Sequence, residues 1–136
     1  MRLARALGIA ALCVNALGTV AKAQTLMTAD EFDAFSRGKT LDYSVNGRIW
    51  GSETYGPDRK TLDADVGGPC LEGRWFAEGD AICFVYPARD GQHCWQYWRD
   101  GDAVFARPLS AAPGDPPQRV TVASGPLACP GPDVGV

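Results

Sequence analysis

The sequence is poor in the residues and motifs on which many catalytic and metal sites are built. It contains a single histidine, His93, and two methionines in 136 residues. No two cysteines have the CxxC spacing of a zinc or redox site, and no serine lies in a G-x-S-x-G motif. These absences argue against a zinc centre and against a serine or cysteine nucleophile.

Long apolar runs are lacking everywhere except at the N-terminus. There, Met1–Arg5 is a basic region and Ala6–Val20 is an apolar region too short for a comfortable bilayer span, followed by a small-x-small cleavage site that ends at Ala23. We expect a signal peptide over residues 1–23, cleavage after Ala23, and a periplasmic or secreted protein with no membrane span. The alternative is a lipoprotein anchored through Cys13, but leucine precedes that cysteine where a lipobox requires Gly or Ala.

An excess of positive charge is also lacking. Residues 24–136 would form a single domain by length, with ten basic and sixteen acidic residues. Nucleic acids and anionic membranes both select basic surfaces. We therefore expect neither of these partners.

Four cysteines remain after the expected cleavage: Cys70, Cys83, Cys94 and Cys129. An even number in an exported chain predicts two disulfides, for which three connectivities exist. We favour Cys83–Cys94 because of the strand register described below, and Cys70–Cys129 then follows by elimination.

The segment Cys70–Trp98 holds three cysteines, three tryptophans and the histidine, and it predicts three strands. These strands are Arg74–Phe76, Ala81–Tyr86 and His93–Arg99. In the first hairpin we place Ala77 opposite Asp80, so that Trp75 faces Ile82.

In the second hairpin we place Tyr86 opposite Gly91. Cys83 then lies directly opposite Cys94, within reach of a disulfide. Because strand side chains alternate between faces, one face collects the expected core. That face carries His93 and the residues Trp75, Ile82, Phe84, Trp95 and Tyr97.

The remainder of the chain predicts one helix and further short strands. Thr28 and Glu31 form a capping box that begins a helix of about ten residues with Phe32 and Phe35 on one face. Asn46-Gly47 is the strongest hairpin signal in the chain. The remaining strands are expected at residues 39–45, 48–55, 61–66, 102–107 and 119–123.

These elements contain no crossover helix, so we predict a mainly β fold. The strands should form an antiparallel meander that gives a twisted open sheet or a partial barrel, with one short N-terminal helix covering it. We assign residues 24–107 to this β-rich domain. Residues 108–136 would be a Pro-rich C-terminal extension tied back by a disulfide.

Candidate acid–base groups are present, but their spacing selects no pair. A lone histidine such as His93 is more often a packed or rim residue than a base. The carboxylates available as an acid and a base are Glu53, Asp63, Asp65, Glu72 and Glu78. We expect no catalytic residue, no metal ligand and no cofactor.

Aromatic residues supply the candidate binding surface. An apolar or sugar-binding pocket could draw on Trp50, Trp75, Trp95, Trp98, Tyr43, Tyr55, Tyr86 and Tyr97. We select Trp75, Trp95, Tyr97 and Trp98 as candidate binding residues. Trp98 and Phe76 fall on the face opposite the expected core. They form an interaction patch if that face is exposed and a second core layer if it is covered, and both alternatives stand.

Several segments resemble a known group of proteins. The run MTADEFDAFSRGKTLDYSVNG, with WGSETYGPDRK, CLEGRW, ICFVY and HCW after it, resembles small exported proteins of alphaproteobacteria that carry a domain of unknown function. The resemblance covers Met27 to Arg107 and implies no activity. Gly73-Arg74-Trp75 is similar to the Gly-x-Trp motif of lipocalins. There the motif lies near the N-terminus, so the similarity concerns fold and not function.

We interpret the chain as an exported, non-enzymatic protein-interaction module, such as an inhibitor or an envelope accessory factor. Its unknown protein partner would contact exposed aromatic residues, including Trp98. The alternative is a lipocalin-like carrier of a small apolar ligand, with a cavity lined by Trp75, Trp95 and Tyr97.

Overall fold

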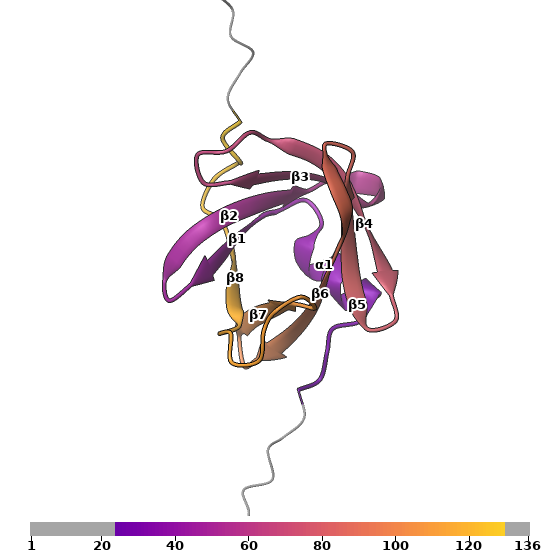
Figure 1. The fold of residues 1–136 in the computed structure, drawn as a ribbon, viewed down its shortest axis with the longest axis vertical. Coiled ribbons are helices and arrows are strands. Elements are labelled where there is room, and N and C mark those ends of the chain that lie inside the picture. Colours follow the sequence, from indigo (N-terminus) through magenta and orange to yellow (C-terminus); the bar gives the residue numbers. More distant parts are fainter. Residues whose placement is uncertain (1–23, 130–136) are drawn as a thin grey trace, which may run out of the picture.

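The computed structural model describes residues 24–129, and the expected signal peptide over residues 1–23 lies outside them. Eight antiparallel strands follow one another around a closed barrel (Figure 1). The elements are α1 (Ala29–Ser36), β1 (Thr40–Val45), β2 (Arg48–Tyr55), the 3-10 turn η1 (Pro57–Arg59), β3 (Lys60–Asp65), β4 (Leu71–Glu78), β5 (Ala81–Tyr86), β6 (Arg89–Asp100), β7 (Ala103–Pro108) and β8 (Gln118–Val122). The predicted mainly β meander with a short N-terminal helix is confirmed.

The meander closes because β8 pairs with β1 as well as with β7. Leu41 lies opposite Val122, and Tyr43 lies opposite Val120. We expected residues 108–136 to form an extension, but β8 lies within them and completes the barrel. The prolines that suggested the end of a domain lie in the connection between β7 and β8. Proline interrupts a strand, but it does not prevent another strand from forming after it.

Helix α1 fills one end of the barrel. The Thr28 amide donates to Glu31 Oε2 over 2.8 Å, and the Glu31 amide donates to Thr28 Oγ1 over 3.2 Å, so the predicted capping box is present. The helix has eight residues, two fewer than expected. Figure 1 shows it over the interior of the ring of strands.

Phe32 carries the contact between α1 and the barrel interior. Its side chain is fully buried, and its ring centroid lies 4.5 Å from that of Tyr97, 5.1 Å from that of Trp75 and 5.5 Å from that of Tyr55. These partners come from three different strands, so a single side chain joins distant parts of the barrel. Aromatic edge contacts of this kind add to the stabilisation from area burial.

The hairpin between β4 and β5 differs in register from the prediction. Trp75 lies opposite Phe84 and Ala77 lies opposite Ile82, a shift of two residues from the expected pairing. Because strand side chains alternate with a period of two, this shift keeps every side chain on its predicted face. Trp75, Ile82, Phe84 and Tyr97 are accordingly buried, and Trp95 packs against them half-buried.

Both predicted disulfides are present. The β5–β6 pairing places Cys83 opposite Cys94 as expected, and these residues are bonded. Cys70 is bonded to Cys129, which ties the end of the described chain to the start of β4. Two disulfides indicate an oxidising, extracytoplasmic location. Among residues 24–129, no helix has the length and apolar character needed to cross a bilayer.

The position of Phe32 leads to a prediction about stability. Replacing Phe32 by alanine should lower the free energy of unfolding by about 3–5 kcal/mol, the usual cost of removing a buried phenylalanine. Phe35 on the same helix is only partly buried, so Phe35→Ala should cost less than half as much. Urea unfolding followed by circular dichroism measures both, and equal costs would contradict the assigned role of Phe32.

Candidate functional site

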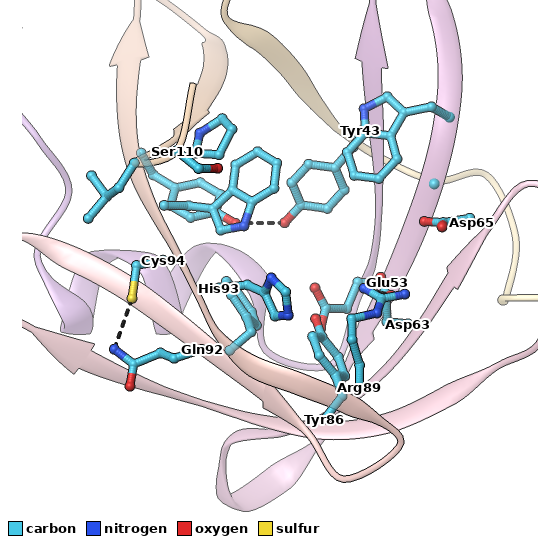
Figure 2. A pocket seen from close by; sticks show the side chains of 17 residues that line it. Tyr43, Glu53, Asp63, Asp65, Tyr86, Arg89, Gln92, His93, Cys94 and Ser110 are labelled. Atoms are coloured by element: carbon cyan, nitrogen blue, oxygen red, sulfur yellow. Dashed lines mark hydrogen bonds and ion pairs between the residues drawn. The ribbon is translucent and has the colours of Figure 1, made fainter. Parts of the chain in front are cut away.

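The end of the barrel opposite α1 holds a cavity of about 480 Å³. This volume lies within the range of small-molecule binding sites. Figure 2 shows side chains from several strands pointing into it. The lining includes Tyr43, Trp50, Glu53, Asp63, Asp65, Phe84, Tyr86, Arg89, His93, Trp95, Tyr97 and Leu109. Phe84 and Tyr97 also pack near Phe32, so they form the floor between the cavity and α1.

One wall of the cavity is aromatic. The ring centroid of Tyr43 lies 6.0 Å from those of both Trp50 and Trp95. The ring centroids of Trp50 and Trp95 are 6.3 Å apart, and their planes are nearly parallel, with an angle of 10° between them. A bulge supplies Trp50: Tyr43 opposes Gly51 and Ser44 opposes Ile49, so Trp50 has no partner on β1. Bulges re-aim side chains in this way beside functional sites.

A row of tyrosine hydroxyls beneath this wall ends at Glu53. Tyr55 Oη donates to Glu53 Oε2 over 3.0 Å, and Tyr86 Oη donates to Glu53 Oε1 over 2.8 Å. Since the Tyr55 proton is committed to Glu53, Tyr43 must donate to Tyr55 over 2.6 Å, and Tyr97 must donate to Tyr43 over 3.0 Å. Four hydroxyl protons thus point toward one buried carboxylate, which orders the whole row.

Tyr86 reaches Glu53 because Gly73 lies beside its ring. A Cβ atom added at Gly73 would come within 2.4 Å of the Tyr86 ring. Only glycine leaves space for that ring. The space that the Tyr86 ring needs therefore explains why a glycine stands at this position of the Gly73-Arg74-Trp75 motif.

Glu53 shares the cavity wall with a second carboxylate. Asp63 on β3 lies directly opposite Glu53 on β2. Burial raises the pKa of Glu53 to about 7, and the negative charge of Asp63 adds to this effect. Burial also raises the pKa of Asp63 to about 6, although Arg89, 3.6 Å away, partly offsets the increase. Both carboxylates can therefore take up or release a proton near neutral pH.

His93 lies between the aromatic wall and the carboxylates. Its ring lies 6.2 Å from that of Tyr86, and its Nε2 atom is buried without a hydrogen-bond partner among the described residues. Figure 2 shows the ring in the middle of the cavity. Buried polar atoms are normally paired, so an unpaired one in a cavity indicates a place for a ligand or water. His93 faces the interior beside Phe84, as predicted.

The structure brings together only part of the predicted binding set. Trp95 and Tyr97 line the cavity. Trp75 does not, because it packs on Phe32 and lies under the Arg59 guanidinium at 4.4 Å. It belongs to the core at the helix end of the barrel.

Trp98 requires a correction. Its exposure was left open by the sequence, and the protein-interaction hypothesis required it to be exposed, but it is only 5% exposed and stacks on Phe105 with 6.0 Å between ring centroids. Leu26 forms a β-bridge with Trp98, so the segment before α1 runs beside this part of β6. Trp98 is therefore a packed residue on the outer face, and Phe76 is half-buried.

The carboxylate pair was visible in the sequence only as two members of a larger acidic set. Its selection required the pairing of β2 with β3, which places Glu53 and Asp63 opposite each other. The alternation of Glu53 and Tyr55 along one strand was the available signal, since both point to the same face. Arg89 was missed because the third strand was expected to begin at His93, whereas β6 begins at Arg89.

Glu78, Cys83 and Cys94 are the one group of possible metal ligands among residues 24–129. Both sulfur atoms are bonded to each other, so neither is a thiolate that binds a metal. The cavity residues do not form such a group.

Comparison with protein-family models, curated proteins and solved structures found no match to this chain. The resemblance to small exported alphaproteobacterial proteins stays a prediction. The assignment of a function rests on the geometry of the cavity.

The raised pKa of Glu53 predicts a pH-dependent effect on stability. The folded state holds the proton more tightly than the unfolded state, so this contribution to stability is complete below about pH 4.5 and is lost as the pH rises through about 7. Glu53→Gln imitates the protonated form. Its stability relative to the wild type should therefore increase between pH 5 and pH 8, by on the order of 3 kcal/mol.

Chemical denaturation at several pH values measures this difference. Glu72→Gln, at an exposed glutamate on β4, is the matched control and should follow the wild type at each pH. A constant difference between Glu53→Gln and the wild type across this range would show that Glu53 does not carry the perturbed proton.

Proposed function

We propose that the protein binds a small organic molecule in the open end of its barrel. The observation that carries this proposal is the cavity itself, which α1 closes at one end and aromatic side chains line at the other. Eight-stranded meander barrels that enclose ligand cavities include the lipocalins, which supports the proposal at the level of architecture only.

The lining indicates an amphipathic ligand rather than a wholly apolar one. Trp50, Trp95 and Tyr43 offer ring surface for an apolar or aromatic part. Glu53 and His93 offer hydrogen-bonding atoms on the other side. Sites of this kind combine extensive apolar contact with a few polar groups that fix orientation.

We further propose that binding takes place in the periplasm or outside the cell, after cleavage following Ala23. The two disulfides support an oxidising compartment. The protein would act as a carrier or sensor without chemical conversion, and the absence of catalysis stays a prediction.

A protein-interaction role remains a second proposal, as an inhibitor or an envelope accessory factor. Because Trp98 is packed, it does not support this role, and the support comes instead from the open end of the barrel. Exposed apolar side chains lie at three places there: Ile49 and Trp50 near the start of β2, Val66 after β3 and Leu109 after β7. An apolar rim of this kind suits a protein partner.

Fluorescence titration with N-phenyl-1-naphthylamine, a neutral aromatic probe, tests the small-molecule proposal. The disulfide-bonded mature protein should enhance probe fluorescence in a saturable manner. Trp50→Ala should weaken binding about tenfold, the effect of losing about 1.4 kcal/mol of ring contact.

Ile49→Ala is the matched control, because Ile49 is a neighbouring exposed residue that does not line the cavity. It should bind the probe like the wild type. Absence of saturable binding to the wild type, or equal losses in both variants, would contradict a cavity site and favour the apolar rim as the functional surface.

A further inference from the structure

The carboxylate pair in the cavity is unfavourable for the fold. Glu53 and Asp63 oppose each other on neighbouring strands, and like charges in that arrangement destabilise a sheet. Glu53 is only 4% exposed. Two apolar side chains would fill this part of the barrel at a lower cost in folding free energy. We therefore look for a positively charged group that would offset the charge of the pair.

The described protein supplies little positive charge to meet the pair. Arg89 lies 3.6 Å from Asp63, and its guanidinium also lies over the Tyr86 ring at 5.3 Å. Among residues 24–129 Glu53 forms no ion pair, and the hydroxyls of Tyr55 and Tyr86, both neutral groups, donate hydrogen bonds to it. With Asp65 also in the lining, three acidic side chains face one arginine.

The aromatic wall of the same cavity favours a cation as well. Tyr43, Trp50 and Trp95 lie within 6.3 Å of one another, measured between ring centroids. The face of an aromatic ring attracts positive charge, most strongly in tryptophan, and the attraction increases when the cation is removed from water. Carboxylates and ring faces thus select the same sign of charge from different sides.

We propose that the ligand is an organic cation, an amine or substituted ammonium compound with an attached apolar group. Its charged nitrogen would lie between the Glu53–Asp63 pair and the aromatic wall, and its apolar group would lie against Trp50 and Trp95. His93 Nε2, which has no hydrogen-bond partner among residues 24–129, would then accept a hydrogen bond from an N–H of the same head group. This inference rests on the proposed small-molecule function and specifies its ligand class.

An anionic ligand is disfavoured by the same groups. Its charge would meet Glu53, Asp63 and Asp65, with Arg89 as the only opposing cation in the lining. A neutral ligand would leave the buried Glu53 carboxylate without a counter-charge among residues 24–129, which carries a cost whenever Glu53 is ionised. The three charge classes can therefore be separated by affinity.

Isothermal titration calorimetry with three matched naphthalene compounds tests the inference at pH 8. The probes are 2-(1-naphthyl)ethylamine, 2-(1-naphthyl)ethanol and 1-naphthylacetate, which share a ring and differ in head-group charge. The amine should bind at least about tenfold more tightly than the other two, since one buried ion pair is worth 1.4 kcal/mol or more.

Charge-neutral variants identify the residues responsible. Glu53→Gln and Asp63→Asn should each reduce the preference for the amine over the alcohol, while affinity for the alcohol is retained. If one of these two variants fails to fold, the other still tests the inference. Glu72→Gln, at an exposed site, is the control and should leave the preference for the amine unchanged.

The outcomes separate this inference from the proposed function. Equal binding of all three compounds, or tighter binding of the alcohol or the acid, would overturn the cation assignment and leave small-molecule binding intact. If N-phenyl-1-naphthylamine binds and none of the three naphthalene compounds does, the cation assignment is likewise overturned and small-molecule binding stays intact. Failure of all four compounds to bind would overturn both proposals.

Discussion

The pairing of β8 with β1 is the constraint on which the rest of the structure depends. It turns a meander with two free edges into a barrel whose interior positions all face one another. Tyr43 on β1 thereby meets Tyr97 on β6, although 54 positions separate them in the chain. An open sheet would leave this tyrosine row exposed to water at its edge, and Phe32 would have no enclosed space to fill. The Cys70–Cys129 disulfide holds the chain just beyond β8, which supports the closure.

The two ends of the enclosed space differ in chemistry. Around Phe32 the interior is aromatic and filled, so it contributes stability. At the other end the interior is hollow and carries an acidic pair, a bulged tryptophan and a histidine nitrogen that has no partner among residues 24–129. Features that oppose folding or interrupt pairing gather at this one end. Proteins keep such local costs where they serve binding, because the remainder of the fold compensates for them.

Local patterns in the sequence were sufficient to predict the helix, the presence of the hairpins, the inward face of the aromatic segment and the Cys83–Cys94 disulfide, from which Cys70–Cys129 followed by elimination. The capping box, the Asn46-Gly47 turn and the alternation in β5 and β6 each act over a few residues, so they can be recognised without the fold. Barrel closure depends on residues near opposite ends of the domain, and no local pattern reports it. The site could not be predicted for the same reason, because Glu53 and Asp63 meet only through the β2–β3 register. The burial of Trp98 likewise depends on Leu26 and Phe105, which lie beside it in space.

The central claim is that ligands enter the open end of the barrel, and the four tryptophans report directly on it. Each indole N–H gives one signal in a two-dimensional ¹H–¹⁵N NMR spectrum. Trp50 and Trp95 lie in the cavity, Trp75 lies beside Phe32, and Trp98 lies on the outer face. Addition of N-phenyl-1-naphthylamine should shift the Trp50 and Trp95 signals and leave that of Trp98 in place. A shift of the Trp98 signal with Trp50 and Trp95 unchanged would place the binding site outside the barrel and contradict the account.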